Sequence, residues 1–95
     1  MSFFVYLLAS KRNGTLYVGM TDDLVKRVWQ HRNGAIGGFT KRYGVKMLVW
    51  LEAHESRESA YVREHQIKKW NRSLKLELIE NQNPQWHDLW TEIAS

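Results

Sequence analysis

Asn13 and Gly14 form an Asn-Gly pair between two short segments that are rich in β-branched and aromatic residues. Asn-Gly is a strong signal for a tight β-turn, because both residues tolerate the positive φ angles that such turns require. The pair therefore predicts a hairpin that joins a strand over residues 3–9 to a strand over residues 15–20.

The register of this hairpin determines which side chains meet. If Ser10 faces Thr15 across the turn, Tyr6 lies opposite Gly19. Alternate side chains of a strand share a face, so Tyr6 and Tyr17 become diagonal neighbours on one side of the sheet. Gly19 has no side chain, and we expect it to leave open space beside Tyr6. Tyrosine is an ordinary strand residue, so the spacing alone favours structural aromatics.

A first helix is expected after the hairpin. Thr21 is its predicted N-cap, since a threonine hydroxyl can accept a hydrogen bond from a free backbone N–H group, and the two aspartates that follow suit a helix N-terminus. Asn33 and Gly34 provide the predicted end of the helix. The predicted buried stripe is Leu24, Val25, Val28 and Trp29.

The rest of the chain predicts one more strand and three more helices. The stretch over 34–44, which contains several glycines, is typical of a loop, and partial alternation of apolar residues over 45–53 indicates a central strand. Capping residues indicate a long helix from Ser56 to about Trp70, a short one from Ser73, and a C-terminal one over 83–95 that begins at Asn83 and Pro84. This ββαβ order followed by helices predicts an α+β fold, with a three-stranded, largely antiparallel sheet flanked by helices.

Length and composition set limits on function. A chain of 95 residues has the size of one domain, so we expect residues 1–95 to form a single unit. The net charge of +4 favours a polyanionic partner such as a nucleic acid. The absence of cysteine excludes disulfides and the common structural zinc sites, and it is compatible with a cytoplasmic protein. The apolar N-terminal run is too short to span a membrane.

Three charged or titratable residues stand at positions that could carry chemistry. Arg27 and His31 are four residues apart, so a cation and an imidazole project from one flank of the first helix, unless both are simply solvated surface residues. Glu64 falls within the apolar arc of its helix, about 40° from Ala60 and about 60° from Ile67 at roughly 100° per residue. A carboxylate there calls for a partner, either an arginine in a structural salt bridge or a divalent cation.

Two basic pairs add to the positive surface. Lys41 and Arg42 lie in the expected loop, and Lys68 and Lys69 follow Glu64 on its helix. Such residues could contact phosphates and add affinity without sequence specificity, although a solvated lysine or arginine is the commoner case.

The ordered set of these residues resembles the GIY-YIG endonuclease domain, and in particular its small stand-alone bacterial members. The two half-motifs fall on residues 4–6, Phe-Val-Tyr, and on residues 17–19, Tyr-Val-Gly. The similarity continues through Arg27, His31 and Glu64 and covers about residues 3–80. The family fold is a three-stranded antiparallel sheet flanked by helices, which agrees with the elements predicted above.

The resemblance implies a metal-dependent endonuclease that hydrolyses phosphodiester bonds in DNA. In the family pattern, Glu64 holds one Mg²⁺ or Mn²⁺ ion, Tyr17 acts as the general base and Arg27 stabilises charge on the phosphate. Tyr6 and His31 position the reactants or assist proton transfer. The products are expected to carry a 3′-hydroxyl and a 5′-phosphate. The expected substrate contacts are Gly19, Lys41, Arg42 and Lys68.

Two departures from the family pattern define the alternatives. Phe4 replaces the glycine of the first half-motif, and Met20 stands where repair-type members often carry a lysine. The missing lysine favours a nucleic-acid-binding module that is catalytically weak or inactive. A protein-interaction domain that exposes Trp86 and Trp90 is a third interpretation.

The substrate of the nuclease is the least constrained part of the hypothesis. A chain of this length leaves little room for a separate sequence-reading domain, so we expect structure-directed or weakly specific cleavage of DNA that is branched, nicked or single-stranded. Repair or recombination is the expected setting. The oligomeric state stays open.

Overall fold

A computed structural model describes residues 2–94, and its sheet confirms the predicted α+β class. The sheet is antiparallel and has the strand order β2-β1-β3. Its strands are β1 (Phe3–Ala9), β2 (Leu16–Thr21) and β3 (Met47–His54). β1 is the central strand, and its pairing with β3 carries an irregularity between Leu7 and Leu8. β3 begins two residues later than the predicted start at Val45.

The hairpin between β1 and β2 has the predicted register. Tyr6 pairs with Gly19, and the backbone N–H of Ser10 donates to the carbonyl of Thr15 over 3.0 Å. Asn13 adopts a φ of 57°, in the left-handed region that asparagine tolerates in turns. The expectation of open space beside Gly19 is wrong. A Cβ at Gly19 would lie 2.5 Å from the Tyr6 hydroxyl oxygen, so the Tyr6 ring already fills that space.

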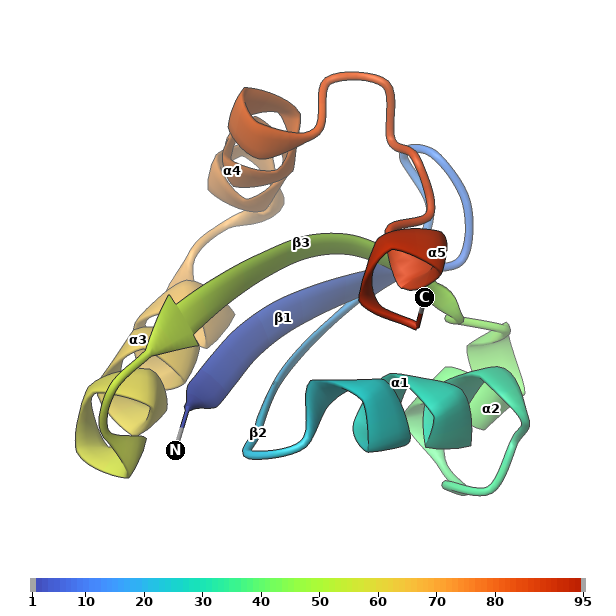
Figure 1. Cartoon of the computed structure of the whole chain (residues 1–95). Helices are drawn as coiled ribbons and strands as arrows, with labels where there is room; N and C mark the ends of the chain where they lie inside the picture. Colours follow the sequence, from blue (N-terminus) through green and yellow to red (C-terminus); the bar gives the residue numbers. More distant parts are fainter. Residues whose placement is uncertain (1, 95) are drawn as a thin grey trace.

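Five helices lie on the two sides of the sheet within residues 2–94. In Figure 1, α3 and α4 lie on one side of the strands, and α1, α2 and α5 lie on the other. The helices are α1 (Leu24–Arg32), α2 (Phe39–Tyr43), α3 (Arg57–Lys69), α4 (Arg72–Gln82) and α5 (Trp90–Ile93). No helix in this part of the chain is long and apolar enough to cross a bilayer.

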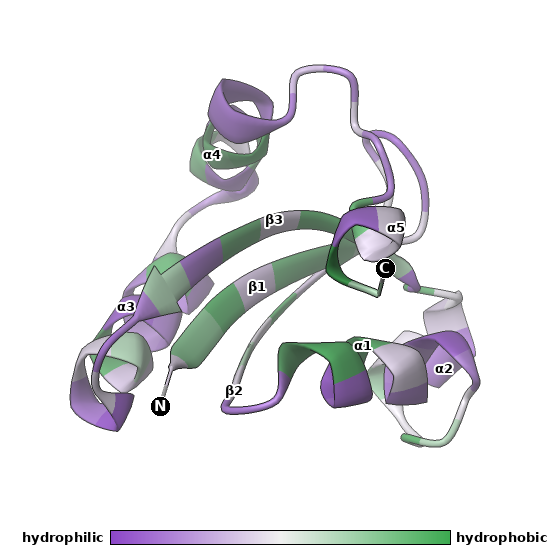
Figure 2. Cartoon of the chain, viewed as in Figure 1, coloured by the Kyte–Doolittle hydropathy of each residue, from purple (hydrophilic) through white to green (hydrophobic). Residues whose placement is uncertain are grey.

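Each face of the sheet has its own core, because successive side chains of β1 point to opposite sides. Val5, Leu7 and Ala9 join a wholly apolar cluster with residues of α3 and α4, which we call the first core. Tyr6 and Leu8 join residues of α1 and the β3 region in the second core. Both faces of β1 are therefore buried, and the hydropathy colouring in Figure 2 runs green along most of β1 and β3.

α1 differs from its prediction at its start and on its surface. Its N-cap is Asp23, whose carboxylate accepts from the Lys26 N–H, whereas the Thr21 hydroxyl accepts from Asp23 just before the helix. Val25 and Trp29 are 43% and 51% exposed, so the predicted buried stripe is too wide. A nine-residue helix that rests on a sheet buries only a narrow strip, which here consists of Leu24, Val28 and His31.

The second half of the chain brings three further corrections. The stretch over 34–44 contains the short helix α2, bounded by Gly38 and Gly44 with positive φ. Asn71, not Ser73, is the N-cap of α4. Asn83 ends α4 instead of starting a helix, because its side-chain amide donates to the carbonyls of Val49 and His87. The last helix therefore begins at residue 90, while the predicted end of the C-terminal helix, residue 95, lies outside the described residues.

The tryptophans of the C-terminal segment complete the two cores. Trp86 is buried in the first core, and its indole N–H donates to Glu80. Trp90 packs against the second core, beside the guanidinium of Arg32. The interpretation that these two side chains form an exposed interaction surface is therefore wrong.

Candidate active site

Two tyrosines and a histidine form an aromatic cluster in the second core. The ring centroids of Tyr6 and Tyr17 lie 6.4 Å apart, and His31 of α1 lies 6.1 Å from Tyr6 and 5.2 Å from Tyr17. The Tyr6 hydroxyl is hydrogen-bonded to Nε2 of His31 over 3.2 Å. The hairpin register and the orientation of α1 thus bring together three residues that the sequence separates by up to 25 positions.

Tyr6 is fully buried, and this environment holds its proton in place. Burial raises the pKa of Tyr6, and the nearby Tyr17 raises it further. The charge of Arg27 and a hydrogen bond from it lower the pKa of Tyr6 in part. The carboxylate of Glu64 also raises the pKa of Tyr6, so it lies within electrostatic reach. Tyr6 is consequently suited to donate or relay a proton and poorly suited to act as a base.

His31 links Tyr6 to a residue that the sequence analysis missed. Its Nδ1 is hydrogen-bonded to the hydroxyl of Thr40 on α2 over 2.9 Å, and both side chains are buried. Burial lowers the pKa of His31, and the charge of Arg27 lowers it further, so the imidazole is neutral at pH 7. A neutral imidazole has one donor and one acceptor nitrogen, and it therefore connects the two hydroxyls. Thr40 carries no sequence signal of its own, because it lies in a stretch typical of a loop.

Gly19 makes the aromatic cluster possible. A side chain at this position would meet the Tyr6 hydroxyl at 2.5 Å and Cε2 of Tyr17 at 3.0 Å. Only glycine lets both rings close over the edge strand β2. The observed role of Gly19 is thus to admit the Tyr6 ring.

Arg27 stands at the open side of the cluster. It is partly buried on α1 and lines a small depression of about 210 Å³. The other residues around this depression are Thr21, Asp22, Asp23, Lys26 and Gln30. The guanidinium can therefore reach both the Tyr6 phenol and a group that arrives from solvent.

Glu64 occupies the predicted position on the apolar side of α3. It is only 8% exposed and lies between the fully buried Ala60 and Ile67 on the helix surface. Its carboxylate faces Nζ of Lys68 at 3.4 Å and Nδ1 of His65 at 3.5 Å. Lys68, predicted to contact substrate, thus neutralises part of the charge of Glu64.

The chemistry around Glu64 fits a hard divalent cation with few protein ligands. Residues 2–94 contain no cluster of three or more His, Cys, Asp or Glu side chains that could enclose a metal. Mg²⁺ is commonly bound through one or two carboxylates, with water and phosphate oxygens completing an octahedral shell. The single, nearly buried carboxylate of Glu64 suits that mode of binding.

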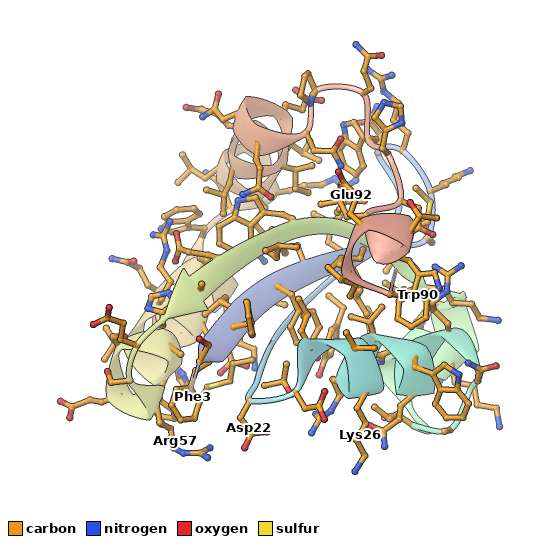
Figure 3. The ribbon with its side chains drawn as sticks, in the orientation of Figure 1. Phe3, Asp22, Lys26, Arg57, Trp90 and Glu92 are labelled. Atoms are coloured by element: carbon orange, nitrogen blue, oxygen red, sulfur yellow. The ribbon has the colours of Figure 1, made fainter. Side chains whose placement is uncertain are left out.

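The site is assembled at the edge strand from both layers. α3 packs against β2 and β1 on the first face, whereas the aromatic cluster lies on the second face. A further contact ties the layers together where α3 begins. Nη2 of Arg57 lies 3.7 Å from Asp22, and its guanidinium carbon lies 4.9 Å from the centre of the Phe3 ring (Figure 3).

Lys41 and Arg42 lie outside this cluster. Both are exposed on α2, and the guanidinium of Arg42 lies 5.6 Å from the centre of the Tyr43 ring. Phe39 lies at the start of α2, and the centroid of its ring lies 6.4 Å from that of Tyr17. This contact connects the exposed surface of α2 to the aromatic cluster.

Comparison with known proteins identifies the domain. The family model of the GIY-YIG catalytic domain matches residues 2–77. The chain belongs to the GIY-YIG family. This is a family of nucleases, so the GIY-YIG assignment implies a nucleic acid substrate and, as a general property of the family, dependence on a divalent metal.

The similar proteins are small GIY-YIG proteins of bacteria. A UPF0213 protein of Clostridium perfringens is 39% identical over 80 residues, which covers 84% of this chain and 85% of that protein. A UPF0213 protein of Syntrophus aciditrophicus is 41% identical over 83 residues, which covers 86% of this chain and 93% of that protein. The solution structure of a UPF0213 protein from Bacillus halodurans has a TM-score of 0.58 and 28% identity over 93% of both chains.

Proposed function

We propose that this GIY-YIG protein is a metal-dependent endonuclease that hydrolyses phosphodiester bonds in DNA. The observation that carries the proposal is the cluster of Tyr6, Tyr17 and His31, with Arg27 on the same helix as His31 and Glu64 on α3, the helix that packs against β2. The charges of Arg27 and Glu64 both act on the Tyr6 phenol, which supports the proposal. A cation, a protonated phenol and a carboxylate are groups that can bind and polarise a phosphodiester.

Glu64 is the proposed ligand of the metal. When bound there, a Mg²⁺ or Mn²⁺ ion would neutralise negative charge on the phosphate. The Glu64 carboxylate supplies a hard oxygen ligand, and its contact with Lys68 is long enough to rearrange without loss of a short hydrogen bond. Lys68 is then free to contact a phosphate, as its predicted role requires.

Tyr17 is the proposed general base, and its difference from Tyr6 supports the assignment. Tyr17 is partly exposed, whereas Tyr6 is fully buried and has a raised pKa. In the proposed reaction, the water oxygen bonds to phosphorus while its proton passes to Tyr17, which reacts as the phenolate. The bond between phosphorus and O3′ breaks, and O3′ takes up a proton. This leaves a 3′-hydroxyl and a 5′-phosphate.

The remaining polar groups support this step. Arg27 would contact the non-bridging oxygens and stabilise their increasing charge. The Tyr6 hydroxyl, hydrogen-bonded to His31, which is itself hydrogen-bonded to Thr40, would position the phosphate or supply a proton to the leaving oxygen.

The biological setting belongs to the same proposal. We infer that residues 1–95 act as one domain, on DNA that is branched, nicked or single-stranded, with weak sequence specificity and in repair or recombination. The net charge of +4 supports a polyanionic substrate. A cytoplasmic location is compatible with a chain that contains no cysteine and therefore needs no oxidising compartment.

A binding module without turnover is the second candidate. Two observations favour it, namely methionine at position 20 and the pairing of Lys68 with Glu64. Such a module would bind nucleic acid in a salt-sensitive way and would leave it intact in the presence of metal.

Cleavage assays separate the two candidates. Purified wild type, Glu64→Ala and Glu77→Ala would be incubated with labelled duplex, single-stranded and branched DNA in Mg²⁺, Mn²⁺ or EDTA. Glu77 is an exposed carboxylate on α4 and serves as the matched control. We expect metal-dependent cleavage by wild type and Glu77→Ala and none by Glu64→Ala. Binding without cleavage under every condition would replace the nuclease with the binding module.

A further inference from the structure

A series of aromatic rings leads from the site to the surface along α2. Tyr17 contacts Phe39 with ring centroids 6.4 Å apart, and Phe39 contacts Tyr43 at 4.9 Å. The two rings of α2 are 47% and 50% exposed, although α2 is only five residues long. Large aromatic side chains that stay half exposed beside a catalytic cluster offer π faces to a ligand.

This surface is also basic and concave. Phe39, Tyr43, Lys41 and Arg42 line an open depression of about 750 Å³ together with Gly38. The Lys41 and Arg42 side chains make no hydrogen bond or ion pair within residues 2–94, so both cations are available to an anionic partner. Basic groups interleaved with aromatic rings are the composition that proteins use to bind single-stranded nucleic acid.

A second exposed aromatic surface, around Tyr61, is not connected to the aromatic cluster. Tyr61 is more exposed than either ring of α2, but its ring partner is His65, at 4.0 Å, on the outer side of α3. No ring contact connects this pair to the aromatic cluster among the described residues. Exposure alone therefore does not distinguish the α2 surface, whereas its continuity with Tyr17 does.

We propose that Phe39 and Tyr43 are a stacking platform for unpaired bases of a single DNA strand whose backbone enters the site. This inference rests on the proposed function and specifies its substrate. In a duplex, each base face is covered by its neighbours, and an aromatic side chain reaches it only after unstacking. An unpaired base presents its face freely, so the platform selects single strands, flaps or splayed ends. Lys41 and Arg42 contact the phosphates on either side of the stacked bases.

Binding measured in EDTA tests the platform without requiring cleavage. Labelled single-stranded DNA and the corresponding duplex would be titrated with wild type, Tyr43→Ala, Tyr43→Phe and the matched control Tyr61→Ala. Removing one stacking ring weakens binding by about 5- to 150-fold in other single-strand-binding proteins. We expect a loss in that range for Tyr43→Ala on the single strand, a loss below about twofold on the duplex, and wild-type affinity for the two controls.

A spectroscopic readout makes the test specific for stacking. The fluorescence of 2-aminopurine in an oligonucleotide is quenched when this base stacks on an aromatic ring. We expect quenching by wild type and Tyr43→Phe and reduced quenching by Tyr43→Ala and Phe39→Ala, with circular dichroism used to verify the fold of each variant. If one alanine variant does not fold, the other carries the test.

The outcomes separate this inference from the proposed function. An equal loss on single strand and duplex, or no loss, would overturn the platform even if wild type cleaves DNA. Tyr43-dependent binding of single-stranded RNA but not DNA would overturn the assignment to DNA. Tyr43-dependent binding of single-stranded DNA by a protein that does not cleave it would support the platform and reject the nuclease.

Discussion

The two faces of the sheet use the same strands for different purposes. The first core, beneath α3 and α4, consists of buried apolar side chains. The second side, beneath α1 and α2, buries the hydroxyls of Tyr6 and Thr40 and the imidazole of His31. No side-chain polar atom in residues 2–94 is buried without a hydrogen-bond partner, so the polar cluster is satisfied within the protein.

The contrast between the two faces shows that most of the buried polar side chains near the sheet lie on the second face. Burying a polar network costs stability unless each member is paired, whereas an apolar core stabilises by exclusion of water alone. The first face therefore stabilises the fold mainly by apolar burial. The second holds a linked set of groups beside an edge strand, and Glu64 is the buried acid that the first layer contributes to it.

Alanine substitutions of two adjacent leucines of β1 test this difference between the faces, and they should have the largest effect on stability. Leu7 faces the first core and Leu8 the second, and both are fully buried. We expect Leu7→Ala and Leu8→Ala each to lower the free energy of unfolding by about 2–5 kcal/mol. Only Leu8→Ala should also reduce cleavage per folded molecule, because Leu8 pairs with Tyr17 across the hairpin. Urea unfolding and cleavage well below the melting temperature measure the two quantities. Equal losses of activity would remove the proposed distinction between the faces.

Arg27→Ala should affect chemistry more than stability. Loss of a preorganised group that stabilises transition-state charge reduces kcat by about 10²- to 10³-fold. Lys26→Ala, which removes an exposed cation one residue away, is the control and should stay within about twofold. Single-turnover cleavage at saturating protein separates this effect from binding. If both variants lose activity equally, Arg27 contributes only general electrostatic attraction.

Gly19→Ala tests how closely the aromatic cluster is packed. The added methyl group would lie 2.5 Å from the Tyr6 hydroxyl oxygen, so the ring must move and its hydrogen bond to His31 must change. We expect a loss of about 1–3 kcal/mol in stability, as is typical of overpacking. Cleavage should fall in Gly19→Ala, and the double variant Gly19→Ala/Tyr6→Phe should stay destabilised, because Cζ of the Tyr6 ring also lies 2.5 Å from the added methyl group. Wild-type stability of Gly19→Ala would show that Tyr6 is not confined.

The lowered pKa of His31 predicts a smaller effect, a dependence of the free energy of unfolding on pH. The unfolded imidazole titrates at a pKa of about 6.5, and the folded pKa is lowered. The unfolded state therefore binds the proton more strongly, so stability is full above pH 6.5 and falls as the pH drops toward the lowered folded pKa. Urea unfolding between pH 5 and about pH 8 should reveal this slope, and His31→Gln should reduce it. An unchanged slope in the variant would assign the pH dependence to other groups.

The predictable features of the fold were those encoded by local sequence. The Asn13–Gly14 turn and strand alternation determine the register, and this register brings Tyr6 next to Tyr17. The burial of Glu64 was likewise predictable from its angular position on α3. These features depend on spacing along one or two adjacent elements.

The other features depend on tertiary contacts. α2 is five residues long between glycines, too short for helical periodicity to appear, and so Thr40 and Phe39 gave no signal. The sequence at Asn83 is typical of a helix start, yet its side-chain amide donates hydrogen bonds to the carbonyls of Val49 and His87. Whether Glu64 would meet the aromatic cluster around Gly19 was equally inaccessible, because the two come from opposite layers of the sheet.

Paramagnetic broadening by Mn²⁺ tests the central claim, that Glu64 and the aromatic cluster form one metal-dependent site at the edge of β2. Amide NMR spectra would be recorded for wild type and Glu64→Gln during titration with Mn²⁺. We predict selective broadening around Glu64 and at Gly19, little broadening at Ile79 in the first core, and loss of the effect in Glu64→Gln. Broadening that persists in Glu64→Gln, or that centres on Asp22 and Asp23, would contradict this account of the site.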